Sequence, residues 1–342
     1  MWAAQLTGLR KLAIREVPEP RLPGHDEVLV RVDAVGICGS DVHNYLEGGI
    51  GSRKVDYPFI PGHEAAGTIL ALGENVLDRQ VGDRIMIEPA MHCGDCDQCR
   101  IGRYNTCRNI QFLSSAGELQ GCMCERVVIP VRNALVVRPA LDPELVALAE
   151  PLSVAVHSVR NSIPITAGVP IAVLGAGPIG LCTLATLLQA GADRVYVTDP
   201  LAARRDMAVR MGAYWCGAPA ELDGLEPLGM GAVFECSGKP DALDQAVELA
   251  GPGSKLVITG IPEGNRVSLD ISQLRRKEVC IFNVRRQNQC AELALQMIDE
   301  GSVAIAGLVT HRFPLAAAAD AFDLVAGYGD GVIKAMVQCV MP

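Results

Sequence analysis

Three kinds of segment that would indicate a membrane, export or nucleic acid are missing from this sequence of 342 residues. No apolar run approaches the roughly 20 residues that cross a bilayer, so we expect no transmembrane helix. Residues 1–6 contain no basic stretch leading into an apolar core, so we expect no signal peptide. There is no Lys- or Arg-rich block, and the formal net charge is −9, which argues against nucleic acid and anionic membranes as partners. These absences predict a cytoplasmic protein.

Length and composition indicate a folded protein of about two domains. Hydrophobic residues make up 49% of the sequence and charged residues 20%, as is typical of globular proteins, and domains of about 150 residues predict two of them. The sequence contains 13 cysteines. Without an export signal, so many thiols favour reduced cysteines and metal ligands over a disulfide framework.

Side chains that bind metals are concentrated in two stretches. Residues 37–43 read Ile-Cys-Gly-Ser-Asp-Val-His, and residues 61–64 read Pro-Gly-His-Glu. A catalytic zinc takes three protein ligands and leaves one position open, so we predict that Cys38, His63 and Glu64 hold such a zinc. The two stretches alone leave a second interpretation equally open, in which a buried thiol lies beside two unrelated polar loops.

The first part of the sequence has the alternating pattern of short strands. Val28, Val30 and Val32 share one face of the segment 26–34, which is the signal of a half-buried strand. Similar patterns follow, separated by turn residues, at 65–71, 84–88, 126–129 and 135–138. Several short strands with turns between them predict a β barrel or sandwich. The loop with Cys38 follows the first of these strands, where a rigid scaffold can hold it.

A second metal site is predicted by four closely spaced cysteines. Cys93, Cys96 and Cys99 lie within seven residues, and Cys107 follows eight residues later. Four thiolates close a tetrahedral shell around one zinc, which makes the site structural. The alternative is a group of free thiols on a surface loop, which would be prone to oxidation.

From residue 170 the pattern changes to alternating strands and helices. An apolar run at 171–174 leads into the sequence Gly-Ala-Gly-Pro-Ile-Gly at 175–180, and an apolar helical run follows. A G-x-G-x-x-G motif between a strand and a helix lets the backbone approach a pyrophosphate at the helix N-terminus. Asp199 ends the next strand, where an acidic side chain binds ribose hydroxyls and repels a 2′-phosphate. The pattern predicts an NAD-binding, doubly wound parallel sheet.

These motifs together resemble those of the zinc-dependent medium-chain dehydrogenases, and within them the sorbitol (L-iditol) and xylitol dehydrogenase branch. The resemblance covers nearly the whole sequence. Besides the four cysteines, the stretches that carry it are 36–43, 61–64, 82–84, 150–153, 175–180, 234–238 and 309–315.

The resemblance implies a fold that is α/β and β. Residues 1–151 and 285–342 would form a GroES-like, β-rich catalytic domain, and residues 152–284 a Rossmann domain with a doubly wound parallel sheet. The implied enzyme holds two Zn²⁺ per chain and transfers a hydride from a secondary alcohol of a polyol, such as sorbitol or xylitol, to NAD, giving a ketose. It is also implied to be a homo-oligomer, a tetramer or a dimer. The apolar run 279–284, expected at a sheet edge, agrees with this.

The resemblance further implies a role for individual residues. Cys38, His63 and Glu64 would be the catalytic zinc ligands, with Glu150 beside the metal or as an alternate ligand. Ser40 and His43 would relay the proton, with Asp41 supporting the metal ligands. The residues implied to lie beside the cofactor are Gly175, Gly177, Ile179, Gly180, Asp199, Arg204, Thr259, Gly260, Ile261, Val284, Arg285 and Arg286. Those implied to line the substrate pocket are Asn44, Glu150, Arg286 and Gln287.

Asn44 and Gln287 depart from the branch, which usually has an aromatic residue at each position. A side-chain amide offers two donors and an acceptor, so we predict a substrate rich in hydroxyl groups; the alternative is that both side chains face solvent. Two other functions stay open on the sequence. One is a threonine or simple-alcohol dehydrogenase of the same superfamily, and the other is a non-catalytic NAD(H)-binding protein.

Overall fold

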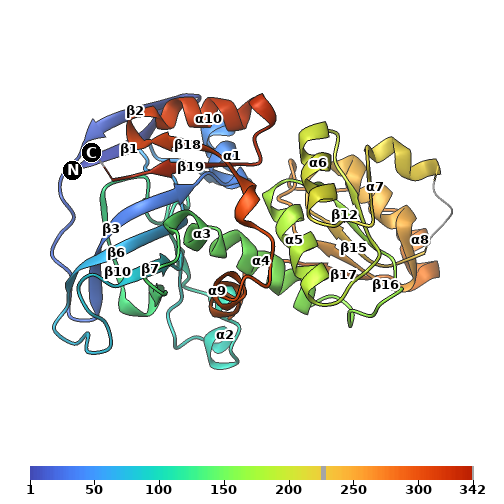
Figure 1. The fold of residues 1–342 in the computed structure, drawn as a ribbon, viewed down its shortest axis with the longest axis horizontal. Coiled ribbons are helices and arrows are strands. Elements are labelled where there is room, and N and C mark those ends of the chain that lie inside the picture. Colours follow the sequence, from blue (N-terminus) through green and yellow to red (C-terminus); the bar gives the residue numbers. More distant parts are fainter. Residues whose placement is uncertain (225–228, 341–342) are drawn as a thin grey trace. The chain divides into compact units, whose positions relative to one another are not determined.

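The computed structural model describes residues 1–224 and 229–340, and the chain divides into two compact units (Figure 1). Unit 1 comprises Met1–Glu150, Ala291–Glu300 and Ala306–Pro342, and unit 2 comprises Pro151–Cys290 and Gly301–Ile305. The sequence predicted that the second domain ends at residue 284, whereas the main segment of unit 2 ends at Cys290. Among the helices described, none is both long and apolar enough to cross a membrane.

Unit 1 is organised around a seven-stranded sheet. The strand order is β11-β7-β6-β3-β19-β18, and β10 also pairs with β3. All neighbours are antiparallel except β18 and β19, which are parallel. The strands are β3 (Glu27–Gly36), β6 (Glu64–Leu72), β7 (Arg84–Ile87), β10 (Arg126–Pro130), β11 (Ala134–Val136), β18 (Val309–Pro314) and β19 (Lys334–Gln338).

The alternating pattern of the sequence explains which face of this sheet is buried. Val28, Val30 and Val32 of β3 are fully buried, whereas Arg31 between them is exposed. All five strand segments predicted from the first part of the sequence are confirmed, as β3, β6, β7, β10 and β11. Two strands from the C-terminal end of the chain, β18 and β19, extend the sheet beyond β3.

Short strands and helices complete unit 1. The strand pairs are β1 (Trp2–Gly8) with β2 (Lys11–Glu16), β4 (Gly49–Ile50) with β5 (Arg53–Lys54), and β8 (Ala90–Met91) with β9 (Gln111–Phe112). The helices are α1 (Gly39–Glu47), α2 (Asp97–Arg100), α3 (Pro143–Ala147), α9 (Ala291–Asp299) and α10 (Ala318–Ala326), with single 3-10 turns at Tyr104–Thr106, Val131–Asn133, Ala306–Leu308, Leu315–Ala317 and Gly329–Gly331. Helix α4 (Ala149–Arg160) begins in unit 1 and continues into unit 2.

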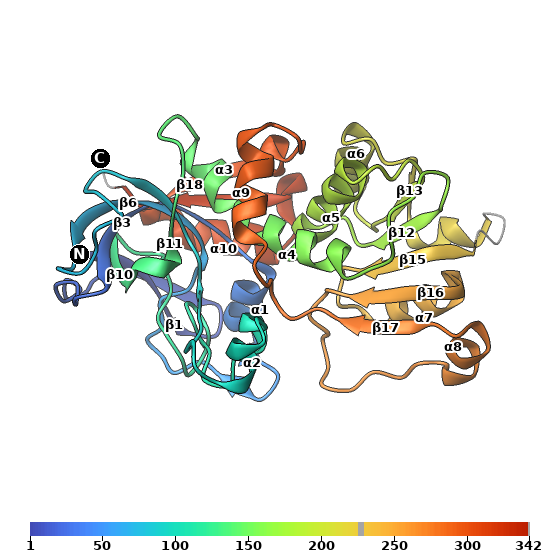
Figure 2. The same ribbon diagram turned by 90° about the horizontal axis from the view of Figure 1, so that it is seen from below.

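Unit 2 is a doubly wound parallel sheet, as predicted. Its six strands are all parallel, in the order β14-β13-β12-β15-β16-β17. They are β12 (Ile171–Leu174), β13 (Val195–Thr198), β14 (Trp215–Gly217), β15 (Met230–Glu235), β16 (Ala250–Ile258) and β17 (Cys280–Asn283). Helices α5 (Pro178–Gln189) and α6 (Ala202–Arg210) lie on one side of the sheet, and α7 (Pro240–Leu249) and α8 (Ile271–Lys277) on the other (Figures 1 and 2). A 3-10 helix spans Pro219–Gly224.

The strand order reverses next to β12. The chain goes from β12 outward to β13 and β14, and then returns to the other side of β12 to form β15. In such sheets, ligands bind outside the carboxyl ends of the strands at the point of reversal. The loop that follows β12 is the glycine-rich stretch 175–180.

Candidate active site and metal centre

The buried carboxylate of Asp41 joins the two loops that carry Cys38 and His63. Asp41 has no exposed surface and lies in the first turn of α1. Its Oδ2 accepts a hydrogen bond from the backbone N of Cys38 at 3.1 Å. Its Oδ1 accepts one from the backbone N of Gly62 at 3.1 Å and one from the Ser114 hydroxyl at 2.8 Å. One carboxylate thus binds both loops, and it also binds a third segment through the hydroxyl group of Ser114.

His63 lies in the same cluster. Its ring is 5% exposed, and its Nδ1 is 3.7 Å from Asp41 Oδ1. That separation is too long for a hydrogen bond, and within the described chain Nδ1 has no hydrogen-bond partner. Burial lowers the pKa of His63, but the negative charges of Asp41 and Cys38 outweigh it and raise the pKa well above its ordinary value. The ring of Phe112 packs against it, with the ring centroids 5.2 Å apart.

The surroundings of His63 fit a bound divalent metal. A thiol, a buried imidazole and an acidic side chain behind the imidazole form the arrangement in which a carboxylate orients a metal-binding histidine. A cation bound here would compensate the negative charges of Asp41 and Cys38, which otherwise raise the pKa of His63.

Glu64 is bound to Lys334. The Nζ of Lys334 donates to both carboxylate oxygens of Glu64, at 2.8 and 2.5 Å, and each residue is only 1% exposed. Over the described residues, the only group of three or more possible ligands whose atoms all lie within 4.8 Å of one another is elsewhere, at the four cysteines. Glu64 as a ligand of the catalytic zinc therefore stays a prediction. A buried carboxylate needs a counter-charge, and Lys334 supplies one.

Glu150, in the first turn of α4, lies within electrostatic reach of this cluster. Burial raises the pKa of its carboxyl group to about 7, and the charges of Glu64 and Glu88 act in the same direction, while His63 and Lys334 oppose them. Ser40 and His43 lie on α1 and are partly exposed. His43 Nδ1 is 3.1 Å from Glu47 Oε1.

The residues predicted to line the substrate pocket have different surroundings. Asn44 is 2% exposed, so this side chain does not face solvent. Gln287 Oε1 accepts a hydrogen bond from the backbone N of Cys290 at 2.8 Å, just before α9. Arg286 precedes it with a positive φ of 53°. The amide oxygen of Gln287 therefore has a structural role in the local turn.

The four cysteines Cys93, Cys96, Cys99 and Cys107 form a compact group. Their sulfur atoms all lie within 4.8 Å of one another, and four of the separations run from 3.4 to 4.0 Å. Zn–S bonds of 2.3 Å in a tetrahedron place the sulfurs about 3.8 Å apart. The donor set and its spacing therefore fit a closed zinc site.

In unit 2, Asp199 holds the glycine-rich loop. Its Oδ2 accepts a hydrogen bond from the backbone N of Ala176 at 2.8 Å, and its Oδ1 one from the backbone N of Leu201 at 2.8 Å. Arg204 Nη1 lies 3.7 Å from Asp199 Oδ2. A Cβ at Gly180 would be 1.8 Å from the carbonyl oxygen of Gly175, so only glycine lets helix α5 start this close to β12. The glycine-rich loop therefore packs directly against the first turn of α5, whose N-terminus is the position where a pyrophosphate binds in this type of sheet.

The other residues predicted for the cofactor lie at the carboxyl ends of neighbouring strands. The backbone N atoms of Thr259 and Gly260 donate to the carbonyl of Glu235, at 2.8 and 2.9 Å, and that of Val284 to the carbonyl of Ile258 at 2.9 Å. These turns follow β16 and β17. Ile261 and Arg285 are their sequence neighbours.

Three residues of the cluster around Asp41 and His63 were not predicted from the sequence: Phe112, Ser114 and Lys334. Only Lys334 left a signal, because it is the single charged residue in the apolar stretch 332–337. A lone lysine in a buried strand pattern indicates an acidic partner. Phe112 is the last residue of β9, and Ser114 lies in the loop after it. The path of this segment determines their partners, and no local sequence pattern specifies that path.

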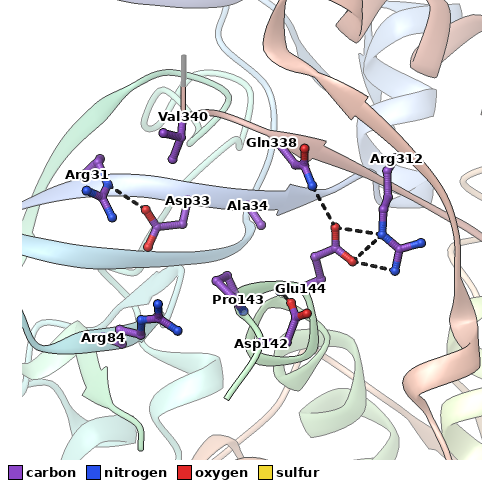
Figure 3. A pocket seen from close by; sticks show the side chains of 10 residues that line it. All are labelled: Arg31, Asp33, Ala34, Arg84, Asp142, Pro143, Glu144, Arg312, Gln338 and Val340. Atoms are coloured by element: carbon purple, nitrogen blue, oxygen red, sulfur yellow. Dashed lines mark hydrogen bonds and ion pairs between the residues drawn. The ribbon is translucent and has the colours of Figure 1, made fainter. Parts of the chain in front are cut away.

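A polar pocket of about 500 Å³ lies on unit 1 and contains none of the predicted site residues (Figure 3). The side chains around it form internal pairs. Arg31 donates to Asp33 at 2.8 Å, and Arg312 donates to Glu144 at 2.8 Å. Three arginines and three acidic side chains line it, so its formal charges balance.

Comparisons with known proteins agree with the two-part architecture. The profile of the alcohol dehydrogenase GroES-like domain matches residues 24–139, and that of the zinc-binding dehydrogenases matches residues 178–300. Sorbitol dehydrogenase of Bacillus subtilis (strain 168) is 35% identical over 344 residues, covering 98% of this chain and 97% of the relative. L-threonine 3-dehydrogenase of the same organism is 33% identical over 322 residues, covering 91% of each chain.

A solved structure is also similar over its whole length. A zinc-binding dehydrogenase of Sinorhizobium meliloti 1021, bound to NADP, has a TM-score of 0.89 and 30% sequence identity, with 98% of each chain covered. These similarities confirm the predicted fold class, a GroES-like β domain together with a Rossmann parallel sheet.

The four-cysteine group generates a prediction about stability. We expect Cys96→Ser to remove one zinc per chain and to lower the thermal unfolding midpoint by roughly 10 °C, because losing a structural metal is among the most destabilising single changes. Metal analysis and calorimetry measure both effects. Cys216→Ser, which removes a thiol from β14 in unit 2, is the matched control and should change neither. Unaltered zinc content in Cys96→Ser would contradict the assignment.

Proposed function

This chain belongs to the zinc-dependent medium-chain dehydrogenases, in the sorbitol dehydrogenase branch, and on that basis we propose that it oxidises a secondary alcohol of a polyol to a ketone with NAD. The observation that carries the proposal is the Asp41 cluster, in which one buried carboxylate holds the loops of Cys38 and His63. A protein that only bound NAD(H) would have no need of a thiol and a buried imidazole in this arrangement.

We propose that Cys38 and His63 hold the catalytic zinc together with a carboxylate, and that the four cysteines hold a second zinc. Glu150 is the carboxylate we favour, because Lys334 engages Glu64. Zinc, when bound, supplies a positive charge that lowers the pKa of a coordinated hydroxyl group and so makes hydride loss easier. Thiolate ligands need a reducing compartment, and so we expect a cytoplasmic location, which imaging of the tagged protein would test.

The chain's own residues would position the reactants and move the proton. Asp41 holds the loops of Cys38 and His63 through their backbone N–H groups, and its negative charge lies 3.7 Å behind the His63 ring. Ser40 and His43, one helical turn apart on α1, offer a hydroxyl and an imidazole along which a proton can pass to solvent. Glu47 Oε1 lies 3.1 Å from His43 Nδ1, a contact that orients the imidazole ring.

We propose NAD as the preferred cofactor. Gly175, Gly177 and Gly180 leave the start of α5 open to a pyrophosphate, and Asp199 stands at the end of β13, where the adenosine ribose binds in this fold. Its carboxylate would repel a 2′-phosphate. Arg204 and Arg205 oppose this effect, and the similar structure from Sinorhizobium meliloti was determined with NADP, so cofactor preference needs a direct measurement.

For the substrate, we propose a polyol, one of whose hydroxyl groups binds Asn44. Asn44 puts a buried amide where the branch usually has an aromatic ring, and buried amides need partners. Gln287 is a weaker candidate, since its oxygen already caps the turn at Cys290. The second candidate is an amino-alcohol substrate, favoured by the similarity to L-threonine 3-dehydrogenase.

A substrate panel tests this proposal. We expect sorbitol, xylitol or an inositol to be oxidised with a kcat/KM at least about 100-fold higher than that of ethanol, because a site built to bind hydroxyls rejects substrates that lack them. NADH absorbance measures the rates, with 2-butanol and threonine included. Best turnover of threonine or ethanol would refute the polyol assignment.

Two variants of Asn44 test its role in substrate binding independently of the reaction that the enzyme catalyses. Asn44→Leu removes the amide but keeps the branching and the number of side-chain heavy atoms, and Asn44→Tyr restores the aromatic residue of the branch. Both should change the ranking of the polyols. If the ranking stays as in the wild type, the role given to Asn44 is wrong although the enzyme class stands.

The cofactor proposal predicts the effect of Asp199→Ser. This change removes the charge but keeps an oxygen that can accept hydrogen bonds from the glycine-rich loop. We expect the preference for NAD over NADP to fall by about ten- to a hundred-fold, the scale of one charge–charge interaction near a protein surface. Asp206→Ser, on the exposed side of α6, is the control. Equal use of both cofactors by the wild type would sink the proposal.

We also propose a homo-oligomer, a tetramer or a dimer, formed through β17. This strand is at the edge of the parallel sheet, and edge strands invite pairing with a second chain. The N–H of Val284 points toward β16, so by alternation the N–H of Ile281 points outward. Ile281→Pro should therefore reduce the mass measured by light scattering, while Ile281→Val should not. A monomeric wild type at micromolar concentration would contradict this.

A further inference from the structure

Ser114 carries the hydroxyl group that contacts Asp41 from the segment after β9. Its residue surface is 6% exposed, and its Oγ donates a hydrogen bond to Asp41 Oδ1 at 2.8 Å. The same oxygen accepts a hydrogen bond from the backbone N of Gly62 at 2.9 Å. Gly62 immediately precedes His63. One hydroxyl group therefore contacts both the carboxylate that holds the Cys38 loop and the backbone next to His63.

These contacts close a ring of three hydrogen bonds. The N–H of Gly62 is shared between Asp41 Oδ1, at 3.1 Å, and Ser114 Oγ, at 2.9 Å, while Ser114 donates to the same carboxylate oxygen. A hydroxyl group can close this ring because it donates and accepts at the same time. A methyl group could do neither, and it would leave the N–H of Gly62 with the longer of its two contacts.

The backbone of Ser114 is in a conformation that serine adopts rarely. Its φ is 62°, in the left-handed region where a residue with a Cβ is strained and glycine is not. Gly117, three residues later, has a φ of 74°, so the same loop uses glycine at another position of this kind. Strained residues gather at functional sites, where the surrounding contacts hold them in place, and here the two hydrogen bonds of the hydroxyl group supply such contacts.

The far end of the same loop is bound to the segment before β6 by other contacts. The backbone N of Gly121 donates to the carbonyl of Ile60 at 2.6 Å, and that of Cys122 donates to the carbonyl of Gly62 at 2.7 Å. These bonds join backbone to backbone and do not involve the side chain of Ser114. Loss of its hydroxyl group should therefore leave the loop in place and change the local hydrogen-bond ring.

We propose that Ser114 is a positioning residue for the catalytic metal site, because its hydroxyl group fixes the His63 loop relative to the Cys38 loop. The inference rests on the proposed zinc-dependent function. The hydroxyl group gives the N–H of Gly62 a second acceptor, and it gives the Asp41 carboxylate a donor from outside both loops. The two side chains proposed to bind the metal are thus held in place before the metal binds, and such preorganisation strengthens binding.

Ser114→Ala tests the role of the hydroxyl group and keeps the Cβ. We expect zinc release from the catalytic site to a chelator to be about ten-fold faster than in the wild type, at the lower end of what residues behind metal ligands control. Cys38→Ser identifies this zinc, because it should lack that phase of release. The visible absorption spectrum of the cobalt-substituted protein should change. The affinity for NAD should not, since both hydrogen bonds of Ser114 lie within unit 1.

Ser114→Gly separates the hydroxyl group from the backbone conformation. Glycine adopts a φ of 62° without strain, so this variant covers the case in which Ser114→Ala does not fold, and it should release zinc as fast as Ser114→Ala does. Ser115→Ala is the matched control in the same loop. The Ser115 hydroxyl accepts a hydrogen bond from Arg53 Nη1 at 3.1 Å, away from the ring around Asp41, so zinc release should stay at the wild-type rate.

The outcomes distinguish this inference from the proposed function. If the wild type holds no zinc that Cys38→Ser removes and oxidises no alcohol, the proposed function fails. If the wild type is an active two-zinc enzyme but either Ser114 variant releases the catalytic zinc at the wild-type rate, the hydroxyl group does not position the site. Equally fast release in Ser115→Ala would mean that any change in this loop loosens the metal, and that result would also refute the inference.

Discussion

The hydrogen bonds of one buried carboxylate, that of Asp41, hold unit 1's candidate site together. Its oxygens accept from the loop before α1, from the loop before β6 and from the hydroxyl of Ser114. Asp41 and Ser114 are 73 residues apart in sequence, and none of the three segments forms a regular element at the point of contact that could fix the others. Because an unsatisfied buried carboxylate is costly, the three segments are constrained to meet, and Cys38 and His63 are placed beside each other as a result.

A second constraint is the balance of buried charge around this centre. Lys334 neutralises Glu64, whereas burial keeps the pKa of Glu150 raised to about 7. Removing one partner of a buried ion pair typically costs about 3–5 kcal/mol, so the strand that carries Lys334 is bound to the site as firmly as the loops are. The ion pair thus adds to the strand pairing by which β19 joins β3 of the N-terminal part of the chain.

Most of the fold could be predicted from the sequence, because its signals are local. Alternation of Val28, Val30 and Val32 with polar residues defines β3, and the glycines of 175–180 define the turn between β12 and α5. The spacing of Cys93, Cys96, Cys99 and Cys107 likewise predicts a compact group, since loops this short cannot separate their sulfurs far. The boundary near residue 285 was less accurate, because packing decides to which unit a connecting segment belongs.

The sequence by itself determined the chemical types at the site: a thiol, two imidazoles, carboxylates and a glycine-rich loop at spacings typical of one enzyme family. Only the tertiary structure decided their partners. It paired Glu64 with Lys334, 270 residues away, buried Asn44, and engaged the amide oxygen of Gln287 in a turn. The physical reason is that a side chain's partner depends on which strands lie side by side. Strand pairing across long sequence separations is set by the burial of whole sheet faces, which a local pattern of residues does not encode.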